Sequence, residues 1–206
     1  TEDINKNKLI KKIFTSQSLG VGFGQPWVFK SELLKLMNPN LVDFMGIPMP
    51  KFKGGAHYTW MILNQNFVGG CFIQNINKNT VQSESDSGHY YDYTYYKYPK
   101  NLKNPKDFFN YSVIKEINFL KKFLKKITSN ASFKLKKLDE KNSVYFPRLV
   151  SKFNSYINWN YDIDELVIFI NAFSDPYPGA TTFLKNKKVY LKNAQVYKNN
   201  NFHSYS

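Results

Sequence analysis

The stretch that best indicates the fold lies at residues 172–184 and reads AFSDPYPGATTFL. Its two prolines and one glycine follow directly on an amphipathic segment. Pro176 and Pro178 fix φ and remove two backbone donors, while Gly179 allows conformations that other residues avoid. A linker does not need such rigidity. The stretch therefore predicts a defined connection after a helix.

The residues on either side support this interpretation. Asp162 and Glu165 have the spacing of a capping box, which predicts a helix running to Phe173. On the other side, Phe183-Leu184 and residues 189–191 flank a polar KNKK turn. We expect a β-hairpin there.

Strands and helices alternate through about residue 127, which predicts an α/β domain with a parallel type of sheet. We expect strands at residues 19–23, 41–45, 71–76 and 90–98. We expect helices from Ser31, from Tyr58 and after Pro105, with Ser31 and Asp107 as caps. The last helix should bury one apolar stripe and expose its lysines. The stripe comprises Phe109, Val113, Ile117, Leu120, Leu124 and Ile127.

Charge and cysteine content narrow the function classes. The 206 residues carry a net charge of +14. Residues 99–206, with 19 basic and 8 acidic side chains, contribute +11 of it. A basic half favours nucleic-acid binding, but Arg148 is the only arginine, and arginine is the usual reader of phosphates and guanine. The single cysteine, Cys71, excludes an internal disulfide and is expected to be buried. No membrane span or signal peptide is evident, so we expect a cytoplasmic protein.

Several phrases along the chain carry a resemblance to a known family. They are SLGVGFGQPWVF at 18–29, GIPMP at 46–50, KGG at 53–55, YTWMILN at 58–64, GGC at 69–71, YFPRL at 145–149 and INW at 157–159. Together with residues 172–184, they resemble the N10-formyltetrahydrofolate-dependent formyltransferases, most closely those that formylate a nucleotide-linked amino sugar. Methionyl-tRNA formyltransferase is similar as well.

The resemblance implies a truncated Rossmann-like formyltransferase domain with a C-terminal helix and a small β extension. Residues 1–130 would be the C-terminal part of the catalytic domain, and residues 131–206 the family's C-terminal extension. The resemblance also implies N10-formyltetrahydrofolate as cofactor and a nucleotide-linked amino sugar as partner. The family's first βαβ portion has no counterpart here. We therefore expect a homodimer, a second chain that supplies that portion, or a fragment.

The catalytic residues depart from the family's pattern. The family uses an Asn-x-His pair and a later Asp, and the resemblance places Asp43, Met45 and Glu84 at these positions. Methionine neither gives nor takes a proton, and an anionic Asp43 would repel a developing oxyanion. We therefore hypothesise an impaired or inactive enzyme, a pseudoenzyme. The matching substrate loop comprises Gly46, Pro48, Pro50, Gly54, Gly55 and His57.

Two histidines could replace the missing one. His57 and His89 lie near the expected site, although both also fit surface loops, and His203 lies in a polar tail. No histidine pair has metal-ligand spacing. The six tyrosines at positions 90–98 could stack on bases, but amphipathic rings covering an edge strand fit better. The alternative function is a tRNA- or nucleic-acid-binding module that uses the basic second half.

Overall fold

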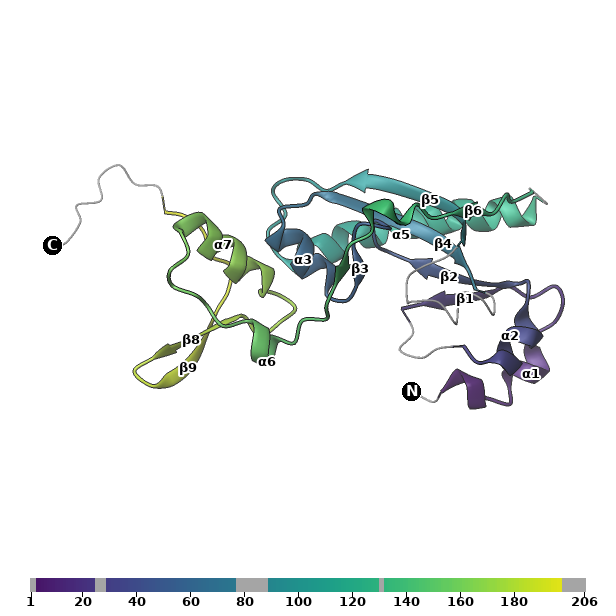
Figure 1. Ribbon diagram of the computed structural model, residues 1–206, viewed down its shortest axis with the longest axis horizontal. Helices are drawn as coiled ribbons and strands as arrows, with labels where there is room; N and C mark the ends of the chain where they lie inside the picture. Colours follow the sequence, from purple (N-terminus) through teal and green to yellow (C-terminus); the bar gives the residue numbers. More distant parts are fainter. Residues whose placement is uncertain (1–2, 25–28, 77–88, 130–131, 198–206) are drawn as a thin grey trace. The chain divides into compact units, whose positions relative to one another are not determined.

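The computed structural model describes residues 3–24, 29–76, 89–129 and 132–197 (Figure 1). The chain forms two compact units, each built from three segments. Unit 1 comprises residues 1–55, 68–97 and 112–147, and unit 2 comprises residues 56–67, 98–111 and 148–206. These units are defined by compactness, whereas the predicted boundary at residue 130 separates a catalytic part from a C-terminal extension. That boundary stays a prediction.

Unit 1 contains a five-stranded sheet in the order β1-β2-β4-β5-β6. Its strands are β1 (Gly20–Phe23), β2 (Leu41–Met45), β4 (Val68–Asn75), β5 (His89–Lys97) and β6 (Lys136–Lys137). The α/β class is confirmed. The parallel arrangement, however, holds only for β1 and β2, because every other pair in this sheet is antiparallel. Strand–helix alternation alone does not decide whether neighbouring strands run parallel or antiparallel. Here the residues between β2 and β4 return the chain to the sheet so that β4 runs antiparallel to β2.

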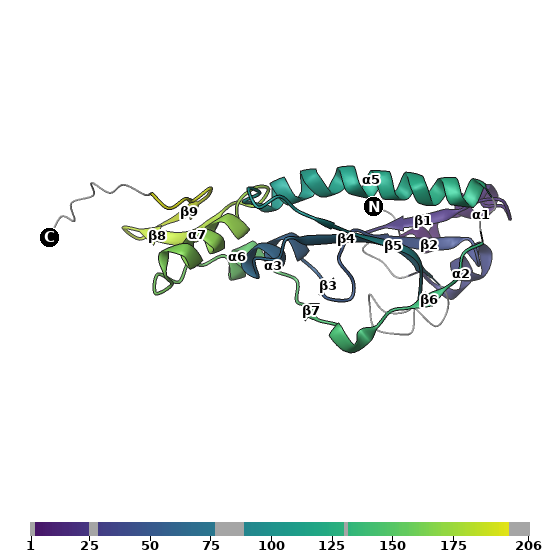
Figure 2. The same cartoon turned by 90° about the horizontal axis from the view of Figure 1, so that it is seen from above.

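One face of the sheet packs against α5 (Pro105–Thr128) (Figure 2). Alternate residues of β2 and β4 point to this face, where they form a core with Phe119 and Phe123 of the helix. The strand residues are Val42, Phe44, Cys71 and Ile73. Cys71 is fully buried, as expected, and burial together with the nearby Glu116 raises its thiol pKa to about 12. It is therefore a core residue without thiolate reactivity.

The predicted stripe of α5 is partly wrong. Phe109, Ile117 and Leu124 are exposed, whereas Phe108, Phe119 and Phe123 are buried. Both sets recur at helical spacing, so periodicity alone leaves the choice open. The buried set brings bulkier rings, and it also includes the small Ser112, which is wholly buried. At the start of α5, Asn104 and Asp107 cap each other's backbone NH groups, so Asp107 acts as one half of a reciprocal cap.

The N-terminal residues pack at the start of the sheet. η1 (Ile4–Lys6) and α1 (Ile10–Ile13) precede β1, and α2 (Ser31–Met37) follows it. Leu33, Leu34 and Met37 of α2 pack with Leu41 and Ile76, partly covered by Ile4, Ile10 and Phe14. The N-cap of α2 is Lys30, and no side chain caps it, so the predicted role of Ser31 is wrong.

Unit 2 contains α3 (His57–Leu63), α6 (Ser151–Asn154), α7 (Ile163–Ala172) and the hairpin of β8 (Ala180–Leu184) with β9 (Lys187–Leu191). Asp162 and Glu165 form the predicted capping box of α7. Lys185 and Asn186 turn the hairpin with positive φ. Gly179 has φ +123°, and a Cβ there would lie 2.8 Å from the Leu191 carbonyl oxygen. The 172–184 stretch is thus a fixed connection between α7 and β8.

Within the described part of the chain, no helix combines the length and apolar character that a bilayer span requires.

Candidate functional site

The predicted site begins at the end of β2. Because side chains alternate along a strand, Asp43 and Met45 share the face opposite α5. On the neighbouring strand β4, Asp43 lies opposite Gln74 and Met45 opposite Phe72. The structure therefore brings both predicted catalytic positions to the same face of the sheet, opposite α5. Glu84 lies outside the described residues, so its role stays a prediction.

The predicted substrate loop follows directly in the chain. A methyl group on Gly46 would lie 2.6 Å from a carboxylate oxygen of Glu116 on α5, so the loop begins in contact with that helix. Burial raises the pKa of Glu116, opposed by a hydrogen bond from Ser112. Pro48 and Met49 are buried, with Met49 in the cluster that includes Phe72 of β4. The carbonyl oxygen of Met49 accepts a hydrogen bond from the Tyr95 hydroxyl at 2.6 Å.

The far end of the loop is held by a segment much later in the chain. β3 (Lys53–Gly54) pairs in parallel with β7 (Tyr145–Phe146), which follows η2 (Glu140–Asn142). The buried Lys53 ammonium pairs with Glu140, and the Phe52 ring stacks on Phe146 at 4.9 Å.

Three backbone hydrogen bonds add to this clamp. They join Lys53 N to Val144 O, Val144 N to Pro50 O and Gly55 N to Phe146 O. Gly54 has φ +95°, and a Cβ there would collide with the Phe146 carbonyl oxygen, so only glycine fits. The loop from Gly46 to Gly55 is therefore fixed at both ends.

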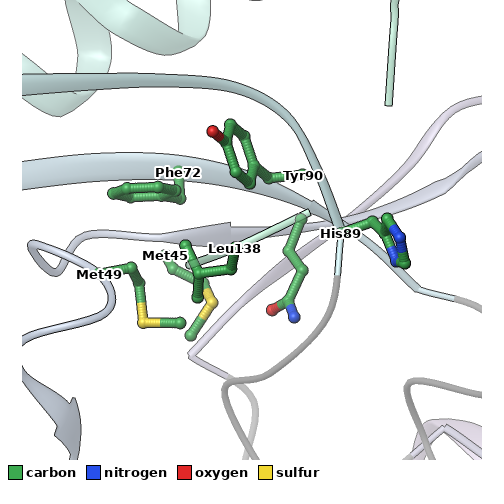
Figure 3. A pocket seen from close by; sticks show the side chains of 7 residues that line it. Met45, Met49, Phe72, His89, Tyr90 and Leu138 are labelled. Atoms are coloured by element: carbon green, nitrogen blue, oxygen red, sulfur yellow. The ribbon is translucent and has the colours of Figure 1, made fainter. Parts of the chain in front are cut away.

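A small pocket with a mainly apolar lining opens on this face of unit 1 (Figure 3). Its apolar floor comprises Met45, Met49, Phe72 and Leu138. Gln74, His89 and Tyr90 also line it. Figure 3 shows the Met45, Met49 and Leu138 side chains gathered together near the Phe72 ring.

The two candidate histidines occupy different units. His89 is half-buried and lines the pocket with Met45. His57 begins α3 in unit 2, where its ring lies 3.9 Å from that of Tyr58. Its Nε2 is shut off from solvent and finds no hydrogen-bond partner among the described residues. Burial lowers the His57 pKa to about 4, which keeps the ring neutral. His203 lies outside the described residues.

Some pocket residues escaped the sequence analysis. Gln74 lies in one of the expected strands. Pairing the strand at residues 41–45 with the strand at 71–76 brings it beside Asp43 once the register is known. Leu138 carried no local signal, since it directly follows β6 and its placement depends on the pairing of β6 with β5. Among the described residues, no cluster of three or more histidine, cysteine or carboxylate side chains could hold a metal ion.

Two curated proteins are similar over most of this chain. The bifunctional polymyxin resistance protein ArnA of Wigglesworthia glossinidia brevipalpis is 22% identical over 169 residues, which are 82% of this chain and 25% of ArnA. The methionyl-tRNA formyltransferase of Borrelia turicatae is 21% identical over 194 residues, 94% of this chain and 59% of that enzyme. This chain thus spans a quarter and about three fifths of the two proteins.

Solved structures share the fold. A 4-N formyltransferase from Francisella tularensis superposes with a TM-score of 0.67 at 17% identity, over 86% of this chain and 72% of that one. The sugar 3N-formyltransferase WlaRD, solved with dTDP and 5-N-formyl-THF, gives 0.62 at 23% identity, over 85% and 60%. Residues 149–204 also match the family model of the formyl transferase C-terminal domain. The chain therefore has the fold of these formyltransferases, and its residues 149–204 match the formyl transferase C-terminal domain.

Proposed function

We propose that this chain binds a nucleotide-linked amino sugar and has lost most of the formyl-transfer activity of its family. The shared fold and C-terminal domain support the family part of the proposal. The sugar part is supported by WlaRD, a sugar formyltransferase whose structure holds dTDP. The nature of the residues at the end of β2 supports the loss of activity.

Acyl transfer to an amine requires two kinds of help. A base must take the proton from the attacking nitrogen, and hydrogen-bond donors must stabilise the oxyanion that forms on the carbonyl. Met45 supplies neither, because a thioether has no proton to give and is only a weak acceptor. Its side chain instead packs with the apolar residues Met49, Phe72 and Leu138. This packing of Met45 into the pocket floor is the observation that carries the proposal.

The folate cofactor fits the described pocket poorly. Pockets that enclose drug-sized ligands measure about 300–1,000 Å³. The pocket beside Met45 is far smaller than that. The described residues thus do not enclose a group as large as N10-formyltetrahydrofolate.

A residual activity would have to use the polar side chains that line the pocket. Among them, His89 carries an imidazole, the side chain that most often serves as a general base. If the chain is active, His89 would accept the proton of the sugar amine, and the formyl group would come from N10-formyltetrahydrofolate. His89→Gln should then abolish whatever turnover remains, whereas His57→Gln should leave it.

The test is an activity assay with N10-formyltetrahydrofolate and a dTDP-linked amino sugar, run beside titration calorimetry with each compound. We expect saturable binding of the sugar nucleotide and little turnover. The double variant Asp43→Asn/Met45→His should increase turnover by on the order of 10²-fold or more, because it restores a base and an oxyanion donor. Rapid turnover by the unaltered chain, or no binding of the sugar nucleotide by folded protein, would refute the proposal.

The alternative is nucleic-acid binding through the basic residues 99–206. It predicts RNA affinity that falls steeply with salt. Filter binding at low and moderate salt tests it, and RNA affinity above that for the sugar nucleotide would favour it. The expected homodimer is tested by analytical ultracentrifugation of the same protein.

A further inference from the structure

The side of α5 that faces away from the sheet carries apolar residues in a line. Residues 112–128 of this helix belong to unit 1, and their inner side holds the buried Phe123. On the outer side, Ile114, Ile117 and Leu124 are 60%, 47% and 39% exposed. Residues three, four or seven positions apart share one side of a helix, so these three lie along one stripe. Single exposed apolar residues are common, whereas an aligned set marks an interaction surface.

Lysines lie in the same stripe. Lys121 occupies the position between Ile117 and Leu124, and Lys125 follows one turn later. Together with Ile114 these residues form the outer stripe of α5, which is about 17 Å long at 1.5 Å per residue. Both lysines are exposed, and neither forms an ion pair with a described residue.

No acidic group of this part of the helix balances those lysines. Glu116 is the only acidic residue in the sequence from 112 to 128. Its carboxylate lies against Gly46 on the inner side of the helix and is half-buried there. The outer stripe therefore combines aliphatic surface with positive charge, and a partner that matches it is anionic and partly apolar.

This charge argues against a second copy of the chain as the partner. Two outer stripes packed together would bring lysines of one copy close to lysines of the other, and like charges at an interface are costly. RNA fits poorly as well, because it is bound mainly through aromatic stacking and arginine. The apolar residues of the outer stripe are aliphatic, and the only arginine, Arg148, lies in unit 2.

The shape of the surface favours a lipid partner over a protein. One side of a single helix is convex, so a protein would need an acidic groove to receive it. The headgroup region of a bilayer adapts to a helix that lies in its plane. Aliphatic side chains then enter the acyl boundary, while lysines extend their charged ends to the lipid phosphates.

We propose that the outer stripe of α5 binds the surface of a membrane that contains anionic phospholipids. Ile114, Ile117 and Leu124 enter the interface, and Lys121 and Lys125 contact the headgroups. Such peripheral binding needs no membrane-spanning helix. It is also independent of the proposed function, because no residue of the outer stripe lines the pocket beside Met45.

The experiment measures co-sedimentation of the full chain with vesicles of phosphatidylcholine, alone or mixed with phosphatidylglycerol. We expect binding to the mixed vesicles only. Lys121→Gln/Lys125→Gln should weaken it about 25-fold, since a lysine near an anionic surface contributes about fivefold. Ile114→Gln/Ile117→Gln keeps the charge and the helix propensity and should weaken binding about tenfold or more, through lost apolar burial.

Unit 1 offers a matched lysine control. Lys51 and Lys141 are also exposed and form no ion pair with a described residue. They directly precede β3 and lie in η2, on the side of the sheet away from α5 (Figure 2). Lys51→Gln/Lys141→Gln removes the same charge and should weaken vesicle binding by less than about twofold, because both charges lie away from the bilayer.

A fluorescent label reports the contact directly. Cys71 is fully buried and its thiol pKa is about 12, so a thiol reagent should modify only an introduced cysteine. Ile117→Cys, labelled with an environment-sensitive nitrobenzoxadiazole group, should shift its emission to the blue when mixed vesicles are added. The same label on Lys51→Cys should not shift. Circular dichroism melts confirm that each variant is folded.

Three results would overturn the inference. The first is a folded chain that does not bind mixed vesicles. The second is vesicle binding that the lysine pair weakens but the isoleucine pair does not, because general attraction to polyanions, RNA included, behaves in that way. The third is a dimer in analytical ultracentrifugation that Ile114→Gln/Ile117→Gln dissociates, since the stripe would then join two copies of the chain.

Discussion

The choice of buried face on α5 can be tested with two adjacent residues. Phe123 is 2% exposed and packs in the core shared by β2 and β4, with its ring 5.1 Å from that of Phe133. Leu124, on the face that periodicity also allowed, is 39% exposed. Truncation of a buried phenylalanine to alanine costs about 3–5 kcal/mol, from lost burial and the cavity left behind. Truncation of the half-exposed leucine should cost about 1 kcal/mol or less, because much of its apolar surface already contacts water.

The assay is urea denaturation followed by circular dichroism. Domains of this size are stable by only about 5–15 kcal/mol, so Phe123→Ala can leave too little folded protein to analyse. Phe123→Leu keeps most of the volume, should cost about 1–2 kcal/mol and leaves a measurable transition. Equal losses in Leu124→Ala and Phe123→Ala, at an unchanged denaturant slope, would refute the assignment of the buried face.

Three further predictions concern backbone strain and pH. Gly179→Ala should lower the free energy of unfolding by about 1–3 kcal/mol in the same urea assay, because φ is +123° and the new methyl group would lie 2.8 Å from the Leu191 carbonyl; an unchanged midpoint would show that the connection can relax. His57 has a folded-state pKa of about 4 against 6.5, so its contribution to stability should be lost as pH falls from 6.5 towards 4. His57→Gln should flatten that part of the profile, and an identical slope in the variant would contradict the buried neutral ring. Glu116 has a raised pKa, so its contribution is present below 4.5 and is lost as pH rises through the folded-state pKa; Glu116→Gln should therefore reduce the decline above pH 4.5, and an unchanged decline would assign it to other groups.

The sequence was most informative where the signal was local. The capping box of α7, a hairpin turn after Leu184 and the burial of Cys71 follow from short-range patterns, and all are present. The turn was predicted at residues 185–188, whereas β9 already begins at Lys187. The prediction of a parallel sheet was wrong for most strand pairs, because strand direction depends on where the chain re-enters the sheet and not on composition. The prediction of the buried side of α5 was wrong in part, because the helix carries two apolar stripes and only contacts with the neighbouring core decide which one is buried.

The residues of the candidate site were likewise only partly predictable from the sequence. Asp43, Met45 and the loop to Gly55 were predicted from the family resemblance, and the structure places Asp43 and Met45 on one face of the sheet and the loop between two fixed ends. The position of Gln74 between Asp43 and Tyr90 depends on two successive strand registers, which no local pattern encodes. His57 and His89 looked equivalent in the sequence, yet only His89 lines the pocket, because the chain leaves unit 1 between Gly55 and His57.

The pairing of β3 with β7 has a consequence for the order in which the parts of unit 1 fold during synthesis. Lys53 and Gly54 find their partners only at Tyr145 and Phe146, so the far end of the loop beside Met45 stays unanchored on the ribosome until those later residues have emerged. Closing such a long loop is slow compared with forming a hairpin. Leu138, which completes the pocket floor, arrives with the same late segment. The pocket is therefore completed late in the folding of unit 1, once β3 can pair with β7.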